Sequence, residues 1–104
     1  MSRAFLLADS SSYNTQKAER YGKRVFIFDH EPHPLNISAM VETVANRLDE
    51  MGFDPSVDYI VLTGNNVSIA MLCATVAAQW GSFNVLAYDA KSGYYVSRSF
   101  TPAA

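Results

Sequence analysis

Thirty consecutive residues, 59–88, contain no charged side chain and no histidine. Long uncharged runs in globular chains are usually buried, because charged side chains are rarely covered on every side. Glycine and asparagine interrupt the run at residues 64–66 and at Gly81, which divides it into an apolar strand, an apolar helix and another apolar strand. This order is a βαβ unit, so the run predicts the buried centre of an α/β sheet.

The size of the chain fits one domain over residues 1–104. With 49% apolar residues, it can bury a core without a metal or a disulfide. The net charge of −2 gives no general attraction to nucleic acid or to membranes, so we expect neither as a partner. The lone Cys73 is expected in the core of the apolar helix and cannot form an internal disulfide. We therefore expect a reducing location, the cytoplasm.

Apolar and alternating runs bounded by turn residues predict strands and helices along the chain. The first helix is expected to follow Asn36 as its N-cap and to end at Gly52. The second is expected over residues 67–80, with Asn66 as its N-cap. Strands are expected over residues 4–8, 24–29, 58–62, 83–88 and 94–100.

These elements predict a single α/β domain with a mixed, mostly parallel five-stranded sheet and two main helices, Rossmann-like in class. The segment between the first two strands, residues 12–22, fits two interpretations. Ser12 could cap a short helix that Gly22 ends, or the segment could be the loop of a long hairpin. In the second case the first two strands would pair antiparallel.

Polar residues follow each of the first four strands, and parallel strands would gather them at one rim of the sheet, where open α/β sheets bind ligands. The turn at residues 63–66 lies before a helix N-terminus, whose amides and dipole favour a phosphate or a carboxylate. It lacks the second glycine and the Lys-Ser/Thr of a P-loop, so a capped tight turn is the simpler interpretation. The candidate ligand-binding residues are Asp9, Ser10, Asp29, Thr63, Gly64, Asn65, Asn66 and Asp89.

Residues 29–33 contain four side chains able to bind a metal, but two prolines in the same loop favour a solvated prolyl segment. We therefore predict no metal and no cofactor. His30 beside Asp29 could act as a base with Ser10 or Ser11 as nucleophile, yet no nucleophile-elbow motif accompanies them. No catalytic residue is assigned.

Half of the basic residues fall within eight positions, beside two tyrosines. Residues 29–58 hold seven acids and one arginine, so the surface is expected to be bipolar. Tyrosine and arginine are favoured anchors of protein interfaces. The candidate partner-binding residues are Tyr13, Lys17, Arg20, Tyr21 and Arg24.

Several short motifs follow one another along the chain. Tyr13 and the AERYG segment at 18–22 precede a VFIF strand, DYIVLTG at 58–64 leads into an Ala-rich helix, and WGSFNVL at 80–86 precedes YVSR at 95–98. The chain thereby resembles a set of small bacteriophage-encoded proteins of uncharacterised function. The resemblance covers nearly the whole chain and implies no catalytic residue. By fold alone, the strand-Thr-Gly-helix turn is also similar to Rossmann-like nucleotide-sensing domains.

The leading hypothesis is a non-enzymatic phage accessory protein that acts in the host cytoplasm by binding a macromolecule. A host or phage protein is the expected partner, and the edge strand at 94–100 also predicts a homodimer. The alternative is a small-ligand or nucleotide-binding module that uses the 63–66 turn. A hydrolase at the same rim is the third possibility.

Overall fold

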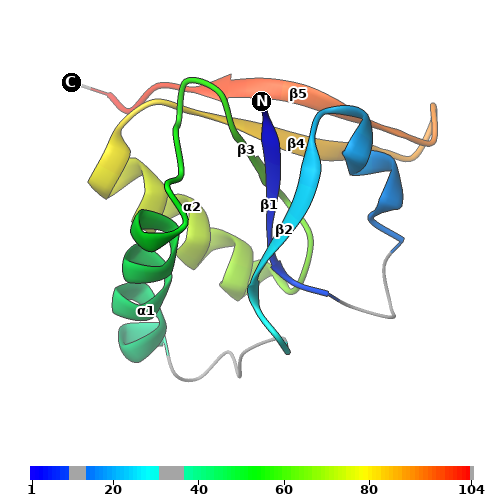
Figure 1. The fold of residues 1–104 in the computed structure, drawn as a ribbon. Coiled ribbons are helices and arrows are strands. Elements are labelled where there is room, and N and C mark those ends of the chain that lie inside the picture. Colours follow the sequence, from blue (N-terminus) through cyan, green and yellow to red (C-terminus); the bar gives the residue numbers. More distant parts are fainter. Residues whose placement is uncertain (10–13, 31–36, 104) are drawn as a thin grey trace.

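The computed structural model describes residues 1–9, 14–30 and 37–103 (Figure 1). Its strands form one sheet in the order β2-β1-β3-β4-β5. The first four strands run parallel to their neighbours, and β5 pairs antiparallel with β4. The strands are β1 (Arg3–Ala8), β2 (Lys23–Phe28), β3 (Tyr59–Val61), β4 (Phe83–Asp89) and β5 (Tyr94–Phe100).

The mixed, mostly parallel sheet of the sequence prediction is confirmed. The alternative antiparallel hairpin of the first two strands is wrong, because Phe5 pairs with Val25 in a parallel register. Parallel neighbours need a crossover rather than a tight turn. Here the connection contains a short 3₁₀ helix, η1 (Gln16–Arg20), which begins after Thr15. The expected cap, Ser12, lies outside the described residues.

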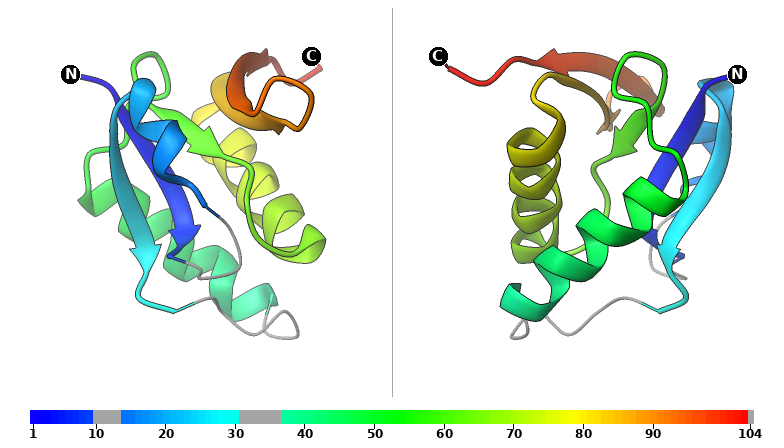
Figure 2. Two further views of the ribbon diagram at one scale, coloured as in Figure 1. Left: turned by 90° about the vertical axis from the view of Figure 1, so that its right-hand side faces the viewer. Right: turned by 60° about the vertical axis from the view of Figure 1, so that its left-hand side comes forward.

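Two layers cover the sheet (Figures 1 and 2). The helices α1 (Ile37–Glu50) and α2 (Asn66–Trp80) pack side by side on one face, and η1 lies on the other. Side chains alternate between the faces along β1: Phe5 and Leu7 join the core beneath the helices, whereas Ala4 and Leu6 join the core beneath η1. Among the described residues, neither helix is long and apolar enough to cross a membrane.

The end of α1 and the start of α2 are capped by the residue types expected there, but the cap of α2 lies one position earlier than expected. Gly52 has a φ of 72° after α1, and Phe53 folds back so that its amide donates to Leu48. At α2, Asn65 rather than Asn66 is the N-cap, since its side-chain oxygen accepts from the Ser68 amide at 2.9 Å. The helix therefore starts one residue earlier than expected. Asn36 lies outside the described residues.

The uncharged run is only partly buried, so the prediction that all its elements are covered is wrong for α2. Val67 is 50% exposed, and Ala70, Ala74 and Ala78 are exposed on the same helix. The reason is that α2 packs against the sheet and α1, while no other described element covers its outer side. Small alanines make this exposure tolerable because they leave little apolar surface in water.

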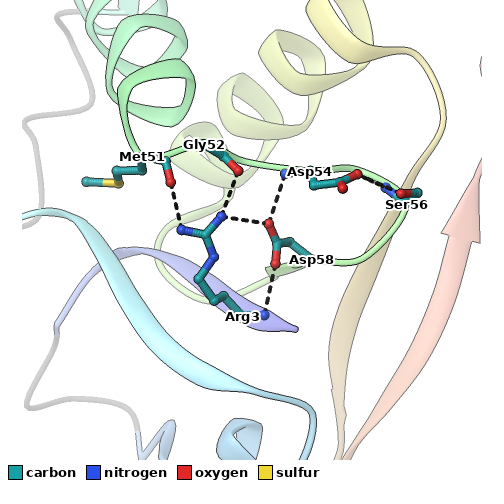
Figure 3. A network of polar contacts seen from close by, with 6 residues as sticks. All are labelled: Arg3, Met51, Gly52, Asp54, Ser56 and Asp58. Atoms are coloured by element: carbon teal, nitrogen blue, oxygen red, sulfur yellow. Dashed lines mark hydrogen bonds and ion pairs between the residues drawn. The ribbon is translucent and has the colours of Figure 1, made fainter. Parts of the chain in front are cut away.

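Asp58 joins three segments at the start of β1 (Figure 3). Its side chain is 1% exposed, and its two oxygens accept from the backbone amides of Arg3 and Asp54, each at 2.9 Å. The Arg3 guanidinium lies 3.1 Å from the same carboxylate and also donates to the carbonyls of Met51 and Gly52. The network fixes β1 to the end of α1 and to the start of β3.

The sheet is strongly twisted between β1 and β4. In Figure 1, β1 runs nearly vertically and β4 nearly horizontally, so the turn between β4 and β5 is carried over towards η1. Figure 2 gives the same arrangement from the side. This twist brings residues of η1 and residues of the β4–β5 turn together although they lie more than seventy positions apart.

Candidate functional site

The short helix η1 presents two cations on the side away from the sheet. Ala18 is fully buried against the sheet, and Lys17 and Arg20 are exposed. In a 3₁₀ helix, residues three positions apart lie on the same side, which places these two side chains next to each other.

The β4–β5 turn meets this side of η1. The Lys17 ammonium donates to the carbonyl of Gly93 at 2.8 Å and lies 4.8 Å from the ring centroid of Tyr94. The Arg20 guanidinium lies 5.8 Å from the same centroid, so both cations contact one aromatic ring. Gly93 has a φ of 75°, a conformation that favours glycine.

Tyr88 of β4 lies beside the same turn. An added Cβ at Gly93 would lie 3.6 Å from the Lys17 nitrogen and 3.9 Å from the Tyr88 hydroxyl, so both groups flank the same glycine. Tyr88 is 53% exposed and Tyr94 49% exposed. Together, Lys17, Arg20, Tyr88 and Tyr94 form what we term the η1 surface.

Two of the other residues expected to bind a partner, Tyr21 and Arg24, lie elsewhere. Tyr21 is half-buried, packs edge-on against Tyr59, and donates its hydroxyl to the Tyr95 carbonyl at 3.0 Å. Arg24 is also half-buried and donates to Glu19 and to the hydroxyl of Thr15. Both residues therefore attach η1 to the sheet. Tyr13 lies outside the described residues.

Tyr88 and Tyr94 were missed by sequence reasoning. They are distant in sequence from the basic segment, and only the parallel topology and the twist of the sheet bring them to it. The available signal was the pair of tyrosines flanking the turn at 89–93, since aromatic residues at the ends of an edge hairpin are accessible to a partner.

The twist of the sheet separates the candidate ligand-binding residues at the carboxyl ends of the strands. Asp9 follows β1, Asp29 follows β2 and the 63–66 turn follows β3, so these segments leave neighbouring parallel strands. Asp89 ends β4 and belongs to the turn beside η1. Ser10 lies outside the described residues. The structure thus keeps Asp9, Asp29 and the 63–66 turn at one end of the sheet and places Asp89 away from Asp29.

The 63–66 turn leads from β3 into α2 and provides the N-cap of that helix. Gly64 has a φ of 120°, which a residue with a side chain rarely adopts, and Asn65 caps α2. Thr63, Gly64 and Asn65 are half-buried, whereas Asn66 is exposed. The Ser68 amide is bonded to the Asn65 side chain and is therefore unable to donate to a ligand.

The candidate metal ligands and nucleophiles lie only partly within the described residues. Asp29 and His30 are exposed, and the rest of the prolyl loop together with Ser10 and Ser11 lies outside that part. No group of three or more potential metal ligands occurs among residues 1–9, 14–30 and 37–103.

Cys73, expected in the core, is half-buried and faces an apolar groove between α2 and the end of β5. The groove has a volume of about 260 Å³ and is lined by Cys73, Ala74, Ala77, Phe83, Phe100, Thr101 and Pro102. Burial raises the pKa of the Cys73 thiol, which keeps it protonated at neutral pH and makes it a weak nucleophile.

Comparison with known proteins places the chain in a family. No curated protein and no solved structure matches the chain. A family model described as "Phage Pam3 gp32-like protein" matches residues 7–102, which is nearly the whole chain. The resemblance to small bacteriophage proteins is thereby confirmed, and the chain belongs to the Phage Pam3 gp32-like protein family.

Proposed function

We propose that this chain is a non-enzymatic phage accessory protein that acts in the host cytoplasm by binding another protein through the η1 surface. The observation that carries the proposal is the convergence of Lys17 and Arg20 on the exposed ring of Tyr94. Tyrosine and arginine supply much of the binding energy in protein interfaces when they lie at the centre of the contact.

Contacts within the chain already hold part of the η1 surface in place. The Lys17 ammonium is held by the Gly93 carbonyl, and the Tyr94 ring lies beside both cations. Binding immobilises flexible side chains at a cost of about 0.5–1.5 kcal/mol each, so side chains already held in place lose less on association. Such a surface favours recognition of one partner geometry.

An affinity capture from host and phage lysates tests this proposal. Arg20→Glu combined with Tyr94→Ala should abolish capture of the main partner while leaving the unfolding temperature nearly unchanged, because both side chains are exposed. Arg98→Glu combined with Phe100→Ala is the matched control, because it changes an exposed arginine and an exposed aromatic at the other end of β5. Capture that survives in the first variant rejects the η1 surface.

A second candidate function is supported by the strand order. The order β2-β1-β3-β4 supports a likeness to flavodoxin-like folds, in which the chain leaves the two central strands for opposite sides of the sheet. Their ligands bind at the carboxyl ends of the two central strands, here Asp9 and the 63–66 turn. A Rossmann-like module that binds a small ligand or nucleotide is the alternative that this arrangement favours.

Thermal unfolding separates the two candidates. A ligand at a hundredfold excess over its Kd stabilises the fold by about 2.7 kcal/mol, which raises the unfolding temperature of a small domain by several degrees. Mono-, di- and cyclic nucleotides should therefore be tested with and without Mg²⁺. Our proposal predicts no shift. A shift that Gly64→Val removes would make the rim the functional site.

A further inference from the structure

We infer that the η1 surface binds an acidic segment of its protein partner, with side-chain carboxylates placed on Lys17 and Arg20. This inference rests on the proposed function and adds the chemistry of the partner. The first observation is that neither cation lies within ion-pair distance of a carboxylate among the described residues. Each is held by Tyr94, and Lys17 also by a carbonyl.

Among the described residues, two arginines are already paired with acids, and Lys17 and Arg20 are among the cations that are not. Arg3 is paired with Asp58 at 3.1 Å, and Arg24 is paired with Glu19 at 3.0 Å. Glu19 lies between Lys17 and Arg20 in the sequence, but its carboxylate accepts from Arg24. The acid closest in sequence to the two exposed cations is therefore already engaged, and their positive charge stays available to a partner.

The donor geometry fits carboxylates. Lys17 gives one donor to Gly93, which leaves two on its ammonium, and Arg20 has no hydrogen bond within the described part of the chain. A guanidinium can bind a carboxylate through two parallel hydrogen bonds. The exposed rings of Tyr88 and Tyr94 beside the cations offer apolar area for the side chains that flank the carboxylates.

The charge distribution favours an acidic protein segment over a nucleic acid. Nucleic-acid affinity grows with the number of phosphates neutralised, and strong binders contact about 6–10 of them. The η1 surface has two cations, and Glu19 lies between them in the sequence. Asp89 and Lys91 lie at the β4–β5 turn, and the whole chain has a net charge of −2. Two cations match a pair of carboxylates, whereas a longer phosphate backbone would also meet these acids.

A titration of the ¹⁵N-labelled protein in low salt tests the inference, with hexaglutamate, hexaglutamine and the oligonucleotide dT6 as probes. Hexaglutamate should shift the amide signals of residues 16–20 and 92–95, and hexaglutamine should not. Arg20→Gln should weaken hexaglutamate binding about threefold to tenfold, the loss expected for one charge-assisted contact at an exposed site. Arg98→Gln, which removes an exposed arginine elsewhere, should leave it unchanged.

Three results would overturn the inference. One is equal hexaglutamate binding by the unmodified protein and Arg20→Gln. Another is a stronger response of the same amides to dT6, which would indicate a nucleic-acid surface. The third is no response to hexaglutamate while lysate capture still depends on Arg20 and Tyr94, which would leave the proposed function intact. Capture that is independent of these two residues would instead reject the proposed function, whatever the peptide does.

Discussion

Replacing Asp58 with alanine is expected to lower the free energy of unfolding by about 3–4 kcal/mol. The change leaves the amides of Arg3 and Asp54 without their acceptor, and each bond to a charged group contributes about 1.5–3 kcal/mol. The Arg3 guanidinium adds little, because its side chain is 31% exposed and water screens the ion pair. Domains of this kind are stable by about 5–15 kcal/mol, so the variant should still fold.

Urea unfolding, followed by circular dichroism, measures this effect. At a slope of about 1.5 kcal/mol/M, the midpoint should fall by about 2–2.7 M with the slope unchanged. Asp58→Asn keeps one carbonyl acceptor and should cost less than Asp58→Ala. Asp49→Ala, at an exposed acid of α1, should stay within about 0.5 kcal/mol of the unmodified protein. A loss of less than about 1 kcal/mol for Asp58→Ala would refute the role given to this carboxylate.

Gly22→Ala should also destabilise the fold, because its Cβ would lie 2.3 Å from the Ser2 carbonyl oxygen and the backbone would have to move; an unchanged urea midpoint would contradict this. Burial raises the pKa of Tyr95, so its stabilising contribution is present below the ordinary pKa of 10.0 and is lost as pH rises through the higher folded value. Stability should therefore fall more between pH 9 and pH 11 in the unmodified protein than in Tyr95→Phe, and parallel pH profiles would disprove it. Strand β5 predicts a homodimer through its edge or an adjacent face, measurable by light scattering; monomer mass at high concentration would end that idea.

Most of the fold could be predicted from local patterns. The alternation in β5 and the apolar positions of α1 each depend on neighbours in sequence, and both elements appear where they were expected. The charge-free run also predicted the positions of β3 and β4 correctly. It failed for α2 because the absence of charge shows that a helix can be buried, but not that another element is present to cover its outer side.

The candidate site was harder to predict, since it depends on tertiary structure. Lys17 and Arg20 were found from charge clustering, and both are exposed. Tyr21 and Arg24 belong to the same cluster, yet their hydrogen bonds with Tyr95 and Glu19 attach η1 to the sheet. Tyr94 joins the surface only through the twist that carries β5 over η1, which no local pattern encodes.

Site-specific photo-crosslinking in host cells tests the central claim most directly. A benzophenone amino acid at position 94 lies at the centre of the η1 surface, and the same residue at position 57 lies at an exposed site between α1 and β3. The account predicts a covalent adduct with a partner protein from position 94, lost when Arg20→Glu is added, and none from position 57. Adducts from position 57 alone, or adducts from position 94 that persist with Arg20→Glu, would contradict it.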